Sequence, residues 1–197
     1  TPIEKFDVAT NSASGWRSEN VNADGGFDVV LDGKHSGSVK QFALSGDHNR
    51  ANALAALAAA RHAGVPVAVG LKALETFSGI KRRMEIRGVV RDITVIDDFA
   101  HHPTAIRLTL AGLRQTAGKA RILAVLEPRS NTMKLGTMKA QLPASLREAD
   151  LVFCYTNNLG WDAAEALSSI ANKTQCHGDL DQLVTAVCEQ AQTGDQM

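Results

Sequence analysis

Alternating apolar and helical segments are the feature of this sequence that most constrains its fold. Strand-like runs are expected at 93–96, 121–126, 151–155 and 174–177, with helical segments at 105–115, 138–149, 163–171 and 179–192. Strands that are apolar along most of their length are typical of a sheet that is buried on both faces. The pattern therefore predicts an α/β domain with a mostly parallel sheet between two layers of helices.

The first part of the chain has a different pattern. A hairpin is expected from strands at 27–31 and 38–44 joined by a turn at Asp32-Gly33, and helices at 49–62 and 67–77 follow. Ser78-Gly79 ends the second helix, and a new strand follows after three cations. This break predicts a domain boundary, with one domain in residues 1–78 and the other in residues 79–197.

Composition excludes several classes of protein. The net charge is +0, the pI is near 7.0 and aromatic residues make up only 5% of the chain, so neither nucleic acid nor a membrane surface is an expected partner. The cysteines Cys154, Cys176 and Cys188 are widely spaced, which favours reduced core thiols over a zinc site. Since there is no signal sequence or transmembrane run, we expect a cytoplasmic protein.

Both ends of the sequence indicate a fragment. The first residue is Thr1 rather than methionine, and residues 193–197 resemble a turn that leads into a further strand. We therefore expect that this chain is part of a longer protein.

Polar side chains follow the first strand of the alternating region. Asp97 and Asp98 end this strand, His101 and His102 come next, and Pro103 suits the first position of a helix. Open α/β sheets bind their ligands at the carboxyl ends of strands. The same residues also fit an ordinary loop with a capping carboxylate and solvated histidines.

Two further loops carry polar residues in the equivalent place. Glu127, Arg129, Ser130 and Asn131 follow the second strand, and Asn157, Asn158 and Trp161 follow the third. If the strands are parallel neighbours, these loops meet in one crevice. Arg129 is suited to hold a carboxylate in two parallel hydrogen bonds, although a loop arginine paired with Glu127 fits the pattern equally.

A second candidate cluster begins the helix at 49–62. His48, Asn49 and Asn52 offer hydrogen-bond donors and acceptors there, and the two asparagines share one helix face. Such amides suit the edge of an adenine ring. On pattern alone, an ordinary helix cap formed by Asp47 or Asn49 is the favoured interpretation. The sequence contains no phosphate loop of the Gly-x-x-x-x-Gly-Lys-Ser/Thr type and no Gly-x-Gly-x-x-Gly fingerprint.

Three segments resemble the Mur ligases, the ATP-dependent amide-bond formers of peptidoglycan synthesis. They are Gly46-Asp47-His48-Asn49-Arg50-Ala51-Asn52, Phe77-Ser78-Gly79-Ile80-Lys81-Arg82-Arg83, and Asp97-Asp98-Phe99-Ala100-His101-His102-Pro103-Thr104 together with Glu127-Pro128-Arg129-Ser130-Asn131. The resemblance implies a Rossmann-like C-terminal domain at 79–197, preceded at 1–78 by the end of an α/β ATP-binding central domain.

The resemblance also implies roles for individual residues. His48, Asn49 and Asn52 match the segment beside the adenine of ATP, Arg83 matches an arginine that reaches its phosphates, and Asp98 matches an aspartate near the ribose. His101 and His102 match catalytic-loop positions, with no division of roles between them. Arg129, and less directly Ser130 and Asn131, match the region that orients the incoming amino acid or peptide. ATP and Mg²⁺ are the implied cofactors, and the Mg²⁺ ligands of the family lie mostly in the part of the ligase that is missing here.

Within the family, these segments are most similar to the ligases that join the tripeptide L-alanyl-γ-D-glutamyl-meso-diaminopimelate to UDP-N-acetylmuramate during peptidoglycan recycling. Relatives that add L-alanine typically have Tyr-Gly where this chain has Phe99-Ala100. Either relative implies an acyl-phosphate mechanism, and the fragment alone is expected to be inactive. A Rossmann-like binding module without catalysis is the other alternative.

Overall fold

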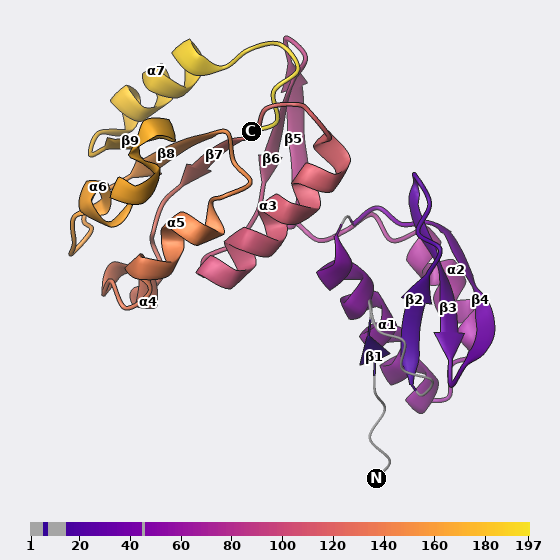
Figure 1. Ribbon diagram of the computed structural model, residues 1–197. Helices are drawn as coiled ribbons and strands as arrows, with labels where there is room; N and C mark the ends of the chain where they lie inside the picture. Colours follow the sequence, from indigo (N-terminus) through magenta and orange to yellow (C-terminus); the bar gives the residue numbers. More distant parts are fainter. Residues whose placement is uncertain (1–5, 8–14, 45) are drawn as a thin grey trace. The chain divides into compact units, whose positions relative to one another are not determined.

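The computed structural model describes residues 6–7, 15–44 and 46–197, and it divides the chain into two compact units (Figure 1). Unit 1 is Thr1–Ile80 and unit 2 is Lys81–Met197. The division follows Ile80, beside the glycine at which the sequence predicts a boundary. Each unit is described below by itself.

Unit 1 is a small sheet with two helices. Its strands are β1 (Phe6–Asp7), β2 (Trp16–Glu19), β3 (Gly25–Leu31) and β4 (Lys34–Gln41), in the order β1-β2-β3-β4. Helices α1 (Asp47–His62) and α2 (Val67–Glu75) follow. The core combines buried side chains of the sheet and of α1, such as Trp16, Phe27 and Leu54.

The hairpin of unit 1 differs from the expected one at the start of its second strand. β4 begins at Lys34 instead of at residue 38. Asp32 and Gly33 have φ values of 48° and 76°, so the turn contains only two residues and pairing resumes directly after it. Lys34 and His35 are polar, which is why hydrophobic patterning places the strand too late.

Unit 2 begins with an antiparallel hairpin of β5 (Glu85–Val90) and β6 (Ile93–Asp97). Its turn residues Arg91 and Asp92 have φ values of 52° and 63°, which confirms the expected two-residue turn. Three parallel strands follow along the chain: β7 (Leu123–Leu126), β8 (Leu151–Tyr155) and β9 (Thr174–His177), in the order β7-β8-β9.

The last residues of the chain lie between these two sheets. Gln196 forms parallel bridges with Thr94 of β6 and with Ile122, which directly precedes β7. The Ile96 N–H donates to the Met197 carbonyl at 2.6 Å, and the Leu123 N–H donates to the Gln196 carbonyl at 2.8 Å. Residues 195–197 therefore join the hairpin to the parallel strands, whereas the sequence pattern predicts only a turn here, before a further strand.

Helices cover both faces of the parallel strands, as the sequence predicts. They are α3 (Pro103–Ala117), α4 (Asn131–Lys134), α5 (Leu142–Ser145), α6 (Ala163–Ala166) and α7 (Leu180–Gln190), with 3-10 helices η1 (Lys139–Gln141) and η2 (Ser168–Lys173). Val152 and Cys154 of β8 join the core formed with α3 and α5, whereas Phe153 joins the core on the α7 side. Figure 1 shows α3 and α7 on either side of these strands.

Two expected helices are broken into shorter pieces. The segment at 138–149 forms η1 and α5, and Pro143 lies in the first turn of α5. Proline lacks an N–H that the first turn would leave unpaired in any case, so here it begins a helix rather than interrupting one. The segment at 163–171 changes from α6 to η2, with non-helical dihedral angles at Ile170.

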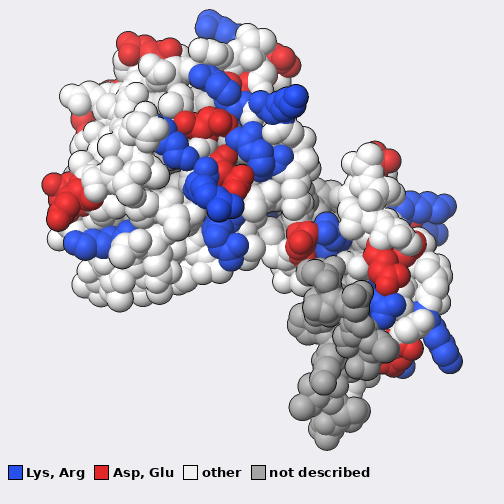
Figure 2. Space-filling model, in the orientation of Figure 1, with Lys and Arg blue, Asp and Glu red and all other residues white. Residues whose placement is uncertain are grey.

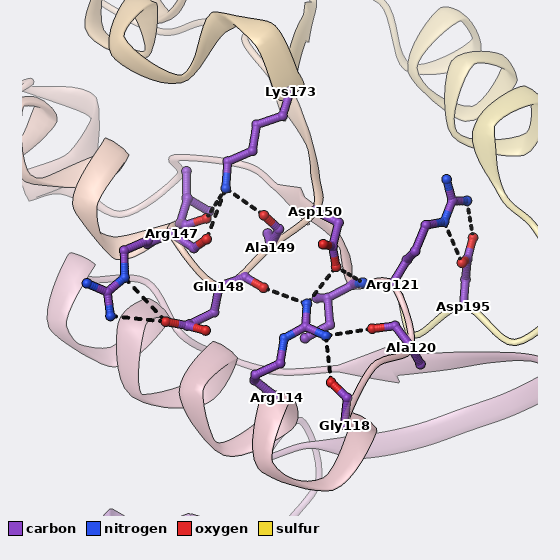
Figure 3. A network of polar contacts seen from close by, with 12 residues as sticks. Arg114, Gly118, Ala120, Arg121, Arg147, Glu148, Ala149, Asp150, Lys173 and Asp195 are labelled. Carbon is purple, nitrogen blue, oxygen red and sulfur yellow. Dashed lines mark hydrogen bonds and ion pairs between the residues drawn. The ribbon is translucent and has the colours of Figure 1, made fainter.

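Charged side chains join the end of α3 to the start of β8. Arg114 donates to the carbonyls of Ala120 and Glu148 and pairs with Asp150 (Figure 3). Burial raises the pKa of Asp150, but hydrogen bonds from the Ile122 N–H and from Arg114 outweigh it and hold this pKa below its ordinary value. This network fixes the edge where the parallel strands begin, which lies opposite the edge that carries the polar loops.

The three cysteines are free but differ in burial. Cys154 is buried, Cys176 is half-buried beside it in register, and Cys188 is exposed. Burial, together with the neighbouring Cys176, raises the pKa of Cys154 to about 12. The expectation of buried thiols therefore fits Cys154 and is wrong for Cys188.

Surface charge and helix length agree with the composition. Figure 2 shows Lys and Arg intermixed with Asp and Glu on the face in view, without a field of one sign. Within the described residues, no helix has both the length and the apolar character needed to cross a membrane.

Candidate functional site

The loop after β6 is organised by Asp98. Its Oδ2 accepts a hydrogen bond from the Met84 N–H at 3.0 Å, and its Oδ1 accepts from the Ala100 N–H at 2.8 Å and from the Thr109 hydroxyl at 3.2 Å. One carboxylate thus connects the segment before β5, the loop after β6 and helix α3. No local pattern predicts this internal role, because two of the donors, Met84 and Thr109, are 14 and 11 residues away from Asp98. The expected contact of Asp98 with a ribose stays a prediction.

The internal role can be tested with Asp98→Ala. Loss of three hydrogen bonds to a charged acceptor is expected to lower the free energy of unfolding of unit 2 by about 1–2 kcal/mol. Urea denaturation followed by Trp161 fluorescence would measure this change. If stability is unchanged while the KM for ATP rises, Asp98 acts on the ligand instead of on the loop.

Two arginines lie over the exposed ring of Phe99, and one of them pairs with Asp97. The Arg82 guanidinium lies 5.0 Å from the ring centroid and that of Arg83 lies 5.9 Å from it. The Arg82 Nε is also 3.4 Å from a carboxylate oxygen of Asp97. Cation–π contacts of this kind orient guanidinium groups without neutralising them. Phe99 and Arg82 were not site candidates in the sequence, although the arginine run and the aromatic residue are both visible in it.

The backbone between Lys81 and Glu85 has an uncommon conformation. Arg82 and Met84 have φ values of 59° and 52°, a region that residues other than glycine rarely adopt. The Glu85 carboxylate accepts a hydrogen bond from the Arg82 N–H at 2.8 Å, which together with Arg87 lowers the pKa of Glu85. Strained backbone held by specific bonds is common at binding sites. Here the backbone conformation fixes the direction in which the side chains of Arg82 and Arg83 point.

The two adjacent histidines have different environments in the structure. His102 is the N-cap residue directly before α3, and its Nδ1 accepts a hydrogen bond from the Thr104 N–H at 3.2 Å. His101 is exposed and lines the cavity described below, with its ring 4.9 Å from that of Phe99. His102 is therefore a helix cap, and His101 is the histidine that a ligand in the cavity can reach. A catalytic role for either one stays a prediction.

The loop after β7 contacts the loop after β6. The Ser130 hydroxyl donates to the His101 carbonyl at 3.2 Å and also accepts from the Met133 N–H at 3.4 Å, so Ser130 caps α4. Arg129 is exposed, and within the described residues its guanidinium has no carboxylate within ion-pair distance. The alternative pairing of Arg129 with Glu127 is therefore not seen; a bond from the Arg129 N–H to the Glu127 carbonyl is present instead, at 2.8 Å.

These two loops line one cavity of about 750 Å³. Its charged and polar lining comprises Arg82, Asp97, Asp98, His101, Glu127, Arg129 and Ser130. Guanidinium and carboxylate groups face the same space, which suits a ligand that carries both a carboxylate and an amine. Asn131 is the first residue of α4 and is exposed, but it does not line this cavity.

The third loop does not contribute to the cavity lining, so the predicted convergence of three loops holds only for two. Asn157 donates to the Tyr155 hydroxyl at 3.1 Å, and Trp161 contacts the α4 segment. The part of the chain that the structure describes contains no group of three His, Cys, Asp or Glu side chains able to hold a metal ion.

The helix start of unit 1 does not have the expected cap. α1 begins at Asp47 with Gly46 as its N-cap residue, and among the described residues no side-chain cap hydrogen bond is seen at this helix start. Asp47 pairs with Arg50 instead, so the simple capping interpretation of Asp47 and Asn49 is wrong. His48 and Asn49 are half-buried and Asn52 is exposed. Their contact with adenine stays a prediction.

Comparison with known proteins identifies close relatives for both units. The family model "Mur ligase, glutamate ligase domain" matches residues 82–197. The chain is 46% identical over 183 residues to the UDP-N-acetylmuramate–L-alanyl-γ-D-glutamyl-meso-2,6-diaminoheptandioate ligase of Escherichia coli, covering 91% of this chain and 40% of that protein. It is 34% identical over 198 residues to the UDP-N-acetylmuramate–L-alanine ligase of Nostoc punctiforme, covering 95% of this chain and 41% of that protein.

Solved structures give the same result. The crystal structure of a murein peptide ligase from Psychrobacter arcticus matches with a TM-score of 0.69 and 41% identity, over 99% of this chain and 42% of that one. The chain thus spans about 40% of the length of the curated relatives it matches.

Proposed function

Because this chain belongs to the Mur ligase family, we propose that the whole protein is an ATP-dependent ligase that forms an amide bond. Its proposed substrates are UDP-N-acetylmuramate and the tripeptide L-alanyl-γ-D-glutamyl-meso-diaminopimelate, as in peptidoglycan recycling. The observation that carries this choice is the 46% identity to the Escherichia coli ligase for that tripeptide, against 31–34% for the L-alanine ligases matched over three quarters of this chain or more. Neither nucleic acid nor a membrane is a proposed partner, and the proposed location is the cytoplasm.

We assign the two parts of the chain to two domains of such a ligase. Residues 1–78 are proposed to end the central ATP-binding domain, and residues 79–197 are proposed to form most of the C-terminal domain. His48, Asn49 and Asn52 would then contact adenine, and Arg83 the phosphates. Since the described residues contain no cluster of metal ligands, we assign Mg²⁺ coordination to no residue of this chain.

The proposed reaction has two steps. The lactyl carboxylate of the sugar attacks the γ-phosphate of ATP, so that ADP leaves and an acyl phosphate forms. The alanine amine of the tripeptide then attacks the acyl carbon, the carbon–oxygen bond to phosphate breaks, and the amine loses its proton. Orientation of the amine is the contribution that unit 2 can make, through the cavity that Arg129 lines.

The lining of the cavity is compatible with the charged end of the tripeptide. This lining places the Arg129 guanidinium and the Glu127 carboxylate in one space of about 750 Å³. The diaminopimelate end of the tripeptide carries both a carboxylate and an amine, which such a pair can bind together. L-alanine, which also carries a carboxylate and an amine, remains the alternative substrate, because L-alanine ligases are also among the relatives.

The test is ligation by the whole protein with ATP and UDP-N-acetylmuramate. We expect phosphate release and a new UDP-sugar product with the tripeptide, and little product with L-alanine at the same concentration. Preference for L-alanine would assign the protein to the biosynthetic relatives. Binding of peptide without any phosphate release would favour the non-catalytic module. The 197-residue chain alone serves as the negative control.

A further inference from the structure

We propose that Trp161 is a positioning residue that holds the α4 segment, and through it Arg129, in place beside the cavity. This inference rests on the proposed function, because it assumes that the loop containing Arg129 presents the peptide. Trp161 comes from the loop after β8 and does not line the cavity.

The contact between Trp161 and the α4 segment has two parts. The Trp161 indole N–H donates to the Met133 carbonyl at 2.7 Å. Its ring also covers Gly136, where a Cβ atom would lie only 2.9 Å from the Trp161 Cδ1. Gly136 has a φ of +70°, so both its conformation and its closeness to the indole require glycine.

The α4 segment needs such an anchor because it is short. Asn131–Lys134 is a helix of four residues, and a helix of one turn is not stable by its own hydrogen bonds. Its first end is held by Ser130, which bonds to the His101 carbonyl, and Met133 is only 3% exposed in the core. Trp161 fixes the other end, so the segment that follows Arg129 is held from two neighbouring loops.

The third polar loop therefore acts on the cavity indirectly. Gly160 also lies close to this segment, because a Cβ there would be 3.3 Å from the Lys134 carbonyl oxygen. Removal of the indole N–H should leave the loop folded but let Arg129 sample orientations that do not bind the peptide carboxylate. The expected result is a weaker hold on peptide with unchanged handling of ATP.

The experiment compares the whole protein with its Trp161→Phe variant, which keeps an aromatic ring but loses the N–H donor. We expect the KM for tripeptide to rise about fivefold, the effect of one net hydrogen bond, while kcat and the KM for ATP stay unchanged. Gly136→Ala, whose Cβ would lie 2.9 Å from Cδ1 of the same ring, should give the same pattern. Leu135→Ala is the control, because the Leu135 side chain is 80% exposed and the substitution keeps the backbone N–H.

Hydrogen exchange gives a second readout that does not depend on catalysis. The amides of Lys134, Leu135 and Gly136 donate within this segment, and they should exchange about fivefold faster in Trp161→Phe. Faster exchange with an unchanged KM for tripeptide would overturn the proposal, as would unchanged exchange. If the unmodified protein forms no amide bond, the proposed function fails, and the exchange experiment still shows whether Trp161 anchors the segment.

Discussion

Replacement of Asp195 by alanine is expected to lower the free energy of unfolding of unit 2 by about 3 kcal/mol. The side chain of Asp195 is only 3% exposed, and it accepts hydrogen bonds from the Arg121 Nε at 2.9 Å and the Arg121 Nη2 at 2.7 Å (Figure 3). It also accepts from the Gln192 N–H at 2.7 Å. The substitution leaves the guanidinium and this N–H without their partner, which is the source of most of the cost.

The position of Asp195 makes the loss larger than for a surface pair. Its carbonyl accepts a hydrogen bond from the Thr94 N–H at 3.0 Å, and Gln196 and Met197 then join β6 to β7. The side chain thus fixes the start of the segment that joins the hairpin to the parallel strands. If this segment detaches, its backbone bonds to both neighbours are lost with it.

The contribution of Asp195 should depend on pH. The hydrogen bond from Arg121 is the main cause that lowers the pKa of Asp195 below its ordinary value, against the opposing effect of burial. A carboxylate whose pKa is lower in the folded state stabilises the fold above the ordinary carboxyl range. This stability is lost as the pH falls through the folded-state pKa. Asp195→Asn should lack that part of the pH dependence.

The measurement can isolate unit 2 because each unit contains one of the two tryptophans, Trp16 and Trp161. In a Trp16→Phe background, Trp161 fluorescence reports urea unfolding of unit 2 alone. Arg147→Ala is the matched control: its ion pair with Glu148 has an arginine side chain that is 84% exposed, and such pairs contribute little. A loss below about 1 kcal/mol for Asp195→Ala would show that residues 195–197 do not depend on this anchor.

Features that depend on neighbouring residues could be predicted from the sequence. The bounds of β8 and β9 were predicted without error, because each is a short run with turn residues on both sides. The hydrophobic period and the position of Pro103 also predicted α3. The polar residues at the ends of the strands predicted a cavity between the loops after β6 and β7.

Features that depend on contacts between residues far apart in the sequence could not be predicted from it. The three donors to Asp98, the bond from Trp161 to Met133 and the ring of Phe99 between two arginines depend on how loops pack, and no local pattern encodes this. Hydrophobic patterning also misplaced the start of β4, where polar residues pair because the turn sets the register. Trp161 was noticed as a candidate for the crevice, and its actual contact is with the segment that borders it.

Arg129→Ala is expected to raise the KM for tripeptide about 30- to 100-fold in the whole protein, with little change in the KM for ATP. This range corresponds to about 2–3 kcal/mol, the loss of a hydrogen-bonded charge pair with a peptide carboxylate. Arg129 is exposed and, in the described part of the chain, has no ion pair, so its removal should change the free energy of unfolding by less than about 0.5 kcal/mol. The effect would therefore report binding rather than stability.

Two variants make this result specific. Arg129→Lys keeps the charge but loses the planar fork, so its KM for tripeptide should lie between those of the unmodified protein and Arg129→Ala. Arg107→Ala removes another exposed arginine of unit 2 that does not line the cavity, and it should leave the KM unchanged. If Arg129→Ala and Arg107→Ala behave alike, Arg129 is not part of the peptide site, while membership of the family is unaffected. If the KM for tripeptide rises only in Arg129→Ala, the peptide carboxylate binds in the cavity between the loops after β6 and β7.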